Sequence, residues 1–225
     1  MSLVWDSRAL NAAAVIGLRF ESDLLAGIAE DIQLRELVEA ELIDQVRFTH
    51  GDEYAFRHPL IRTVAYESQL KSERCRLHRN LATAIEERDP KSCDVNAALI
   101  PEHLEAAGEL RAAWGCHMRA AAWAQSRDVR TVYTSWQRAR GVADCLPVNE
   151  PDRSAMRIEP RMLICGKSWR LGISLDENGF DELRQLCTSV GDDLSPARGT
   201  VGIVMTLVFH NKFREAAVSH RNAPD

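Results

Sequence analysis

The residues best suited to binding chemistry lie where a strand-like segment gives way to a helical one. His58 is followed directly by Pro59, which favours the first position of a helix because it has no N–H to satisfy. A helix that begins here presents free N–H groups and the positive end of its dipole, and both attract anions. Arg57 and Arg62 add positive charge nearby. The sequence therefore predicts an anion contact at these residues, with a solvated basic cluster as the alternative.

One other segment looks like a nucleotide site and fails on inspection. Gly166-Lys167-Ser168 resembles the end of a P-loop, but the motif needs a glycine five residues before Gly166, and Arg161 stands there. The motif also needs a preceding strand, whereas the residues before Gly166 have helical spacing. We therefore expect no phosphate cradle here.

No constellation typical of an enzyme is visible, and the composition excludes several binding classes. The seven histidines are scattered, and no zinc-protease, nucleophile-elbow or paired-carboxylate pattern occurs. The net charge of −5 gives no global reason to bind nucleic acid or anionic lipid. Six cysteines without a C-x-x-C pair favour free thiols over a disulfide framework or a zinc site. No apolar run approaches the roughly 20 residues of a membrane span, and no secretory signal is seen. We expect a non-catalytic, metal-free, cytoplasmic chain.

The N-terminal part predicts a winged-helix domain over residues 4–70. Apolar spacing predicts three helices, at about 7–16, 22–28 and 33–42, and two strands, at 45–48 and 53–56, around a turn at 50–52. Many winged helices bind DNA through the third helix. Here the segment 30–44 carries six acids against the single base Arg35, so phosphates would be repelled. We expect no DNA contact by this segment.

The remainder predicts stacked helices, with a helical linker over 71–108 and tetratricopeptide-like repeats over 109–225. The expected helices are 72–88, 94–107, 110–125, 128–146, 155–173, 180–190, 196–210 and 213–220. After residue 109 the helix pairs recur at roughly 34 to 45 residues, which is typical of an α-solenoid. An irregular helical bundle is the alternative. Trp114, Trp123 and Trp136 are expected in the core. The last helix pair looks interrupted, so the chain is expected to be a piece of a longer protein.

Several segments resemble the region downstream of the nucleotide-binding domain in STAND-type ATPases. The similar segments are Ala13-Ala14-Val15-Ile16-Gly17-Leu18-Arg19-Phe20, Leu37-Val38-Glu39-Ala40-Glu41-Leu42-Ile43, Phe56-Arg57-His58-Pro59-Leu60-Ile61-Arg62 and His103-Leu104-Glu105-Ala106-Ala107-Gly108-Glu109-Leu110. The likeness is greatest to bacterial signalling proteins that join a nucleotide cyclase-like domain, an ATPase, helical repeats and often a LuxR-type helix-turn-helix. It spans most of the chain, and its strongest part is residues 9–145.

This resemblance implies a regulatory role. In that family the winged helix folds back on the ATPase and senses ADP or ATP, while the repeats receive a ligand or a protein partner. His58 is similar to the family histidine that contacts the ADP phosphates, whereas Arg57 and Pro59 depart from the Met and Asp of that motif. ADP or ATP with Mg²⁺ would be bound by the parent protein and not by this chain. The alternatives are a protein-interaction scaffold without nucleotide dependence and an uncharacterised enzyme.

Overall fold

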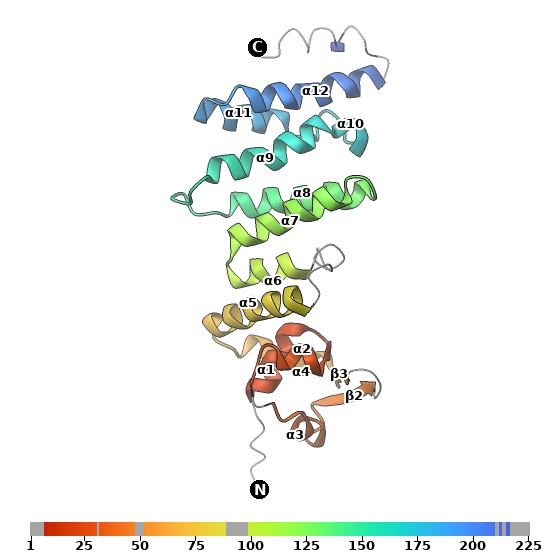
Figure 1. Ribbon diagram of the computed structural model, residues 1–225, viewed down its shortest axis with the longest axis vertical. Helices are drawn as coiled ribbons and strands as arrows, with labels where there is room; N and C mark the ends of the chain where they lie inside the picture. The colour runs from red at the N-terminus through yellow and green to blue at the C-terminus, as the bar shows by residue number, and fades with distance from the viewer. Residues whose placement is uncertain are drawn as a thin grey trace. The chain divides into compact units, whose positions relative to one another are not determined.

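A computed structural model describes residues 7–30, 32–47, 52–88, 99–209, 212 and 215–216, and it is mainly helical with one small sheet (Figure 1). The chain divides into two compact units, Met1–Glu109 and Leu110–Asp225. Each unit is described by itself. Within the described residues, no helix is both long enough and apolar enough to cross a membrane. The helices and the small sheet confirm the expectation of a mainly helical chain with a short antiparallel sheet.

The first half of unit 1 alternates helices and strands. Its elements are α1 (Ser7–Ile16), β1 (Arg19–Glu21), α2 (Ser22–Ala26), α3 (Leu34–Glu39), β2 (Ile43–Arg47) and β3 (Glu53–Phe56). The predicted hairpin is present as β2 and β3, but the sheet has a third strand. β1 pairs antiparallel with β3, with Phe20 opposite Tyr54, so the order is β1-β3-β2. Most of the predicted turn at 50–52 lies outside the described residues.

The third helix is shorter than its predicted range of 33–42. α3 ends at Glu39, and Glu41 then adopts a left-handed backbone conformation with φ 57°. Few residues other than glycine take this conformation, so the chain turns sharply here. After the turn the chain enters β2 at Ile43, which is fully buried. The apolar spacing that suggested a longer helix therefore belongs to a helix followed by a strand.

Three further helices complete unit 1: α4 (Pro59–Glu67), α5 (Lys71–Arg88) and α6 (Leu99–Ala107). α4 begins at Pro59, as the sequence predicts. Leu77 and Leu81 of α5 lie in one hydrophobic core with residues of α1 and the sheet. The residues expected to be a linker thus include a helix that contributes to this core. The first residues of the helix predicted over 94–107 lie outside the described residues.

Every regular element of unit 2 that the structure describes is a helix. The helices are α7 (Leu110–Ala124), α8 (Val129–Asp144), α9 (Arg153–Gly166), α10 (Ser168–Leu171), α11 (Phe180–Val190) and α12 (Leu194–Phe209). The single helix predicted over 155–173 is interrupted at Lys167, which separates α9 from α10. Most of the helix predicted over 213–220 lies outside the described residues. The segment before Gly166 is the helix α9, as its spacing predicts.

The core of unit 2 includes the predicted tryptophans to different degrees. Trp136 is 1% exposed, whereas Trp114 and Trp123 are half-buried against their clusters. Arg161, the residue that breaks the P-loop pattern, is 5% exposed and ion-paired with Asp144 and Glu182. Buried charge of this kind requires such partners, because an isolated ion in the interior is strongly unfavourable. This pairing joins α9 to the end of α8 and to α11.

Candidate functional site

His58 lies between the end of β3 and the start of α4, and it caps the helix. Its backbone is extended, with φ −140° and ψ 136°, and its Nδ1 accepts a hydrogen bond of 3.1 Å from the Leu60 N–H. An accepting nitrogen must keep its lone pair, so the proton of the neutral ring is on Nε2. The side chain is exposed. His58 therefore presents one N–H donor to solvent beside the helix N-terminus.

The two predicted arginines are engaged elsewhere. Arg57 forms ion pairs with Glu41 at 2.7 Å and Asp44 at 3.7 Å, so its charge is balanced within the unit. The Arg62 Nε donates to the Ala14 carbonyl at 3.0 Å, which ties α4 to α1. Among the described residues, no hydrogen bond or ion pair joins His58, Arg57 and Arg62 to one another. The structure thus leaves His58 as the presented group and gives both arginines a structural role.

An apolar stripe follows His58 along the exposed side of α4. Leu60 is 61% exposed and Val64 is 59% exposed, and their spacing of four residues places both side chains on one face. Single exposed apolar residues are ordinary on protein surfaces, but two neighbours beside a capping histidine form a small coherent patch. This α4 stripe is the apolar surface closest in sequence to His58.

A second constellation, which the sequence did not reveal, lies inside unit 1. The Tyr66 hydroxyl is 2.9 Å from His78 Nε2, and His78 Nδ1 is 3.0 Å from His103 Nδ1. These residues come from α4, α5 and α6, and both histidines are less than 10% exposed. The two histidines are separated by 25 residues, so no local motif marks the pair.

Two arrangements of protons are possible in this network of Tyr66, His78 and His103. Only one hydrogen can lie between the two Nδ1 atoms, and each neutral ring carries one proton. Either Tyr66 donates to His78 and His78 donates to His103, or His103 donates to His78 and His78 donates to Tyr66. In both arrangements His103 Nε2 is a buried atom with no hydrogen-bond partner among the described residues. Tyr66, His78 and His103 thus form one polar network, and its unsatisfied end is His103 Nε2.

Burial keeps this network uncharged. Burial, and after it the electrostatic effects of His103, Arg74 and Arg62, together lower the pKa of His78 to about 4. Burial also lowers the pKa of His103, although the Glu102 carboxylate opposes the change. The Arg74 guanidinium lies 5.1 Å from the centroid of the Tyr66 ring and donates to the Tyr66 carbonyl. A cation so close disfavours a second positive charge on His78.

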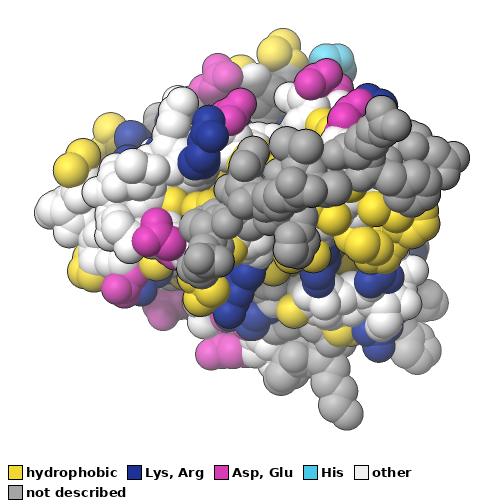
Figure 2. Space-filling model, turned by 90° about the horizontal axis from the view of Figure 1, so that it is seen from above, with side chains coloured by type: hydrophobic (Ala, Val, Ile, Leu, Met, Phe, Trp, Pro, Cys, Tyr) yellow, Lys and Arg dark blue, Asp and Glu magenta, His cyan; other side chains and the backbone are white. Residues whose placement is uncertain are grey.

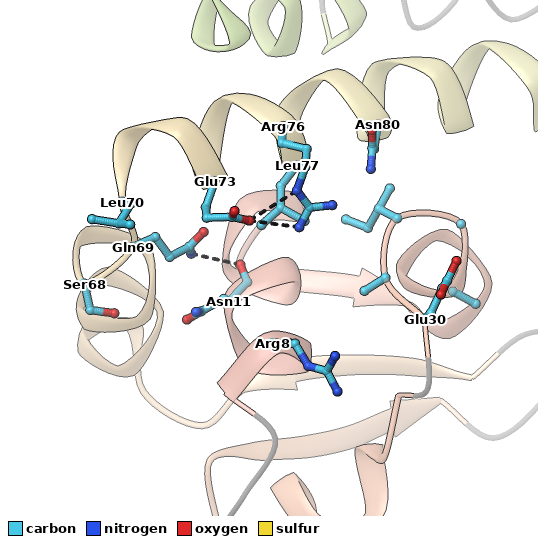
Figure 3. A pocket seen from close by; sticks show the side chains of 14 residues that line it. Arg8, Asn11, Glu30, Ser68, Gln69, Leu70, Glu73, Arg76, Leu77 and Asn80 are labelled. Atoms are coloured by element: carbon cyan, nitrogen blue, oxygen red, sulfur yellow. Dashed lines mark hydrogen bonds and ion pairs between the residues drawn. The ribbon is translucent and has the colours of Figure 1, made fainter.

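A pocket of about 820 Å³ opens on another side of unit 1 (Figure 3). Its walls come from α1, from the segment after α2 and from the junction of α4 with α5. Its polar side chains are Arg8, Asn11, Glu30, Ser68, Gln69, Glu73, Arg76 and Asn80. None of the three residues proposed for nucleotide sensing lines it. Among the described residues, no group of three or more His, Cys, Asp or Glu side chains could hold a metal ion.

Comparison with known proteins finds one distant relative. The chain is 30% identical over 104 residues to an uncharacterized protein of Rhizobium meliloti (strain 1021). The match covers 43% of this chain and 10% of that protein, so the chain spans only a small part of the relative's length. No protein-family model and no solved structure matches the chain.

Proposed function

We propose that this chain is a non-catalytic regulatory segment of a STAND-type bacterial signalling protein. In this proposal residues 4–70 form a winged helix, and the helices after residue 109 form tetratricopeptide-like repeats that receive a ligand or a protein partner. The element order α1-β1-α2-α3-β2-β3 supports the first part, because winged helices share it and place the first strand beside the last. The packing of α7 on α8 and of α8 on α9 supports the second part, whereas α9 packs on both α11 and α12.

The observation that carries the proposal is the presentation of His58. Its Nε2–H lies at the N-terminus of α4, where the helix dipole already favours an anion. The α4 stripe of Leu60 and Val64 gives an adjoining domain an apolar surface to bury. An ATPase domain that docks on this face would bring the phosphates of ADP within reach of His58. The two features together fit a contact that depends on which nucleotide is bound.

The mechanism follows from differential affinity. A closed state in which His58 contacts ADP is favoured when ADP is bound, and a ligand on the repeats would favour an open state only if it binds that state more tightly. Nucleotide and Mg²⁺ would be bound by the ATPase domain of the parent protein in the cytoplasm. Arg57 could add charge to the contact only by leaving Glu41, since the two are paired.

The test separates capping by His58 from phosphate binding by His58. Asparagine is a good helix cap, so His58→Asn keeps the hydrogen bond to the start of α4 and removes the imidazole N–H. In a longer protein that joins the ATPase domain to this chain, His58→Asn should weaken ADP binding by about tenfold, the effect of one lost charge-assisted hydrogen bond. Calorimetry measures the affinity. Thr83→Ala, at an exposed position of α5, is the control and should bind ADP as the wild type does.

An interaction scaffold without nucleotide dependence is the second candidate. Unit 2 exposes apolar side chains on α12, including Leu194, Val201 and Phe209, each about 60% exposed. Trp169 and Phe209 stack with ring centroids 5.3 Å apart. Figure 2 shows hydrophobic side chains gathered on the face at the C-terminal end of the chain. If the longer protein binds no ADP, or His58→Asn binds it as tightly as the wild type, the scaffold replaces the nucleotide relay.

A further inference from the structure

The pocket of unit 1 lies apart from His58, and its size and chemistry suit a small molecule. Its volume of about 820 Å³ falls within the range of roughly 300 to 1,000 Å³ that is usual for ligand pockets. Figure 3 shows Arg76, Leu77 and Asn80 reaching into it from α5, Arg8 from α1, and Glu30 on the facing segment after α2. Side chains from distant parts of unit 1 therefore converge on one space.

The pocket lining carries equal numbers of positive and negative side chains. Two arginines, Arg8 and Arg76, stand against two glutamates, Glu30 and Glu73, and Arg76 is already paired with Glu73 at 2.9 Å. A purely anionic ligand would be repelled by the glutamates, and a purely cationic ligand would be repelled by the arginines. A ligand that carries one charge of each sign can satisfy both sets. The balance therefore favours a zwitterion.

The remaining lining groups define where the parts of such a ligand would bind. Arg76 Nε and Nη2 already donate to Glu73 at 3.2 and 2.9 Å, so the ligand's carboxylate would bind the other edge of the guanidinium, through N–H groups of Nη1 and Nη2. Glu30 has no ion pair among the described residues, so it is available to an ammonium group. Ile28, Ala29 and Leu77 add apolar lining for an aliphatic side chain. Together these groups match a free α-amino acid.

Gln69 lines this pocket and is held in place by two hydrogen bonds. Its Nε2 donates to the carbonyls of Asn11 at 3.1 Å and Ala65 at 2.9 Å, and the residue is only 8% exposed. Its Oε1 has no hydrogen-bond partner among the residues that the structure describes. A buried acceptor without a donor is unfavourable. This oxygen is enclosed by the protein, so the ammonium group of the ligand is assigned to Glu30 alone.

We propose that this pocket binds a free, zwitterionic α-amino acid through the Arg76 guanidinium and the Glu30 carboxylate. The proposal does not rest on the nucleotide relay. It places a ligand in unit 1, whereas the relay places an effector on the repeats of unit 2, and it requires neither His58 nor an ATPase domain. It can therefore be tested on this chain alone.

The experiment measures binding of single amino acids to the 225-residue chain by ligand-observed NMR and calorimetry. For each amino acid that binds, the amine without its carboxylate and the acid without its ammonium group serve as matched probes. At least one amino acid should bind with a Kd of about 1 mM or tighter. Both matched probes should bind at least about tenfold more weakly, because each lacks one of the two charges.

Two kinds of variant locate the site. Arg76→Gln and Glu30→Gln remove one charge each from exposed positions, where loss of an ion pair affects folding little. Each should weaken binding by about tenfold or more. Asn80→Leu fills the pocket, and Asn80 makes no hydrogen bond within the described residues that this change could break. Asn149→Ala, at an exposed position of unit 2, is the control and should bind as the wild type does.

Several outcomes would overturn the proposal. Failure of every amino acid to bind at about 10 mM would show that the pocket takes no such ligand. Equal binding of the matched amine or acid would remove the argument from charge balance. Unchanged affinity in Arg76→Gln, Glu30→Gln and Asn80→Leu would place the site elsewhere. Binding of a peptide or a protein segment in place of free amino acids would make this space a docking groove.

Discussion

At the scale of single residues, the direction of the hydrogen bond between His78 and His103 depends on which Nδ1 atom carries the proton. The two Nδ1 atoms are 3.0 Å apart, so a neutral pair shares one hydrogen and a doubly protonated pair would bring two donors together. Arg74 and Arg62 lie close enough to oppose an additional charge. Protonation of this network should therefore be coupled to the packing of α4, α5 and α6.

The sign of this coupling follows from the direction of the pKa changes. His78 has a pKa near 6.5 when the chain is unfolded and about 4 when it is folded, so the unfolded chain binds more protons between these values. The stability that the neutral histidine contributes is present above about pH 6.5 and is lost as the pH falls towards 4. The loss due to His78 alone is on the order of 3 kcal/mol. The lowered pKa of His103 acts in the same direction.

Urea unfolding of unit 1 at a series of pH values measures this dependence. The double variant His78→Phe/His103→Leu should flatten the dependence between pH 6.5 and 4, whatever its stability at neutral pH, because both titrating rings are gone. Thr83→Ala, on the exposed side of α5, should keep the wild-type slope. If the double variant shows the wild-type slope, the coupling lies in other groups.

At the scale of elements, the closest helix contact in unit 2 is made by a glycine. A Cβ on Gly202 of α12 would lie 1.9 Å from the carbonyl oxygen of Cys165 in α9, which is a severe overlap with backbone. The two helices can approach this closely only because the side chain is absent. Gly141, on the exposed side of α8, has no other atom within 4 Å of the same position.

The two glycines therefore make opposite predictions. Gly202→Ala should destabilise unit 2 by about 3 kcal/mol or more, because α9 and α12 must separate to admit the methyl group. Gly141→Ala should leave the free energy of unfolding unchanged or raise it by about 0.5 to 1 kcal/mol, since alanine is the better helix former. Urea unfolding of both variants gives the comparison. Similar free energies of unfolding for the two variants would show that α9 and α12 can separate at little cost in stability.

The same elements show what local sequence patterns can predict. Pro59 after an alternating segment marked the start of α4 correctly, because proline geometry is a local property. β1 was missed because its three residues are too few to show alternation, and its partner β3 lies more than 30 residues away. The sequence predicts one helix over 155–173, whereas the chain breaks at Lys167 between α9 and α10. The break lies where α12 passes: a Cβ on Gly166 would be 3.3 Å from the Arg198 carbonyl oxygen.

The candidate site shows the same limit. His58 could be singled out because its partner is the helix that follows it directly. The pairing of Arg57 with Glu41 and the hydrogen bond from Arg62 to Ala14 depend on tertiary neighbours that no local pattern names. The histidine pair and the pocket require three or more separate elements to meet. Sequence spacing finds contacts within one element and its cap, and it does not find contacts that tertiary packing creates.

At the scale of the whole molecule, the two units have separate hydrophobic cores. The core of unit 1 contains residues from Ala9 to Leu81, and the clusters of unit 2 contain residues from Leu110 to Cys187. Gly108, with φ 79°, ends α6 just before the boundary at Glu109. Each unit has more than 100 residues, a length at which many domains fold without help from disulfides or metals.

We therefore expect residues 1–109 and 110–225 to fold when each is produced alone. Far-UV circular dichroism should show helix in both fragments, and urea should unfold each in one cooperative transition. Each fragment should also show only the stability effect that arises in its own core. The pH dependence due to His78 and His103 should remain in the first fragment, and the destabilisation by Gly202→Ala should remain in the second. A first fragment without a cooperative transition would show that its core is too small to hold α4, α5 and α6 together by itself. The burial of the histidine network would then depend on residues outside the first fragment.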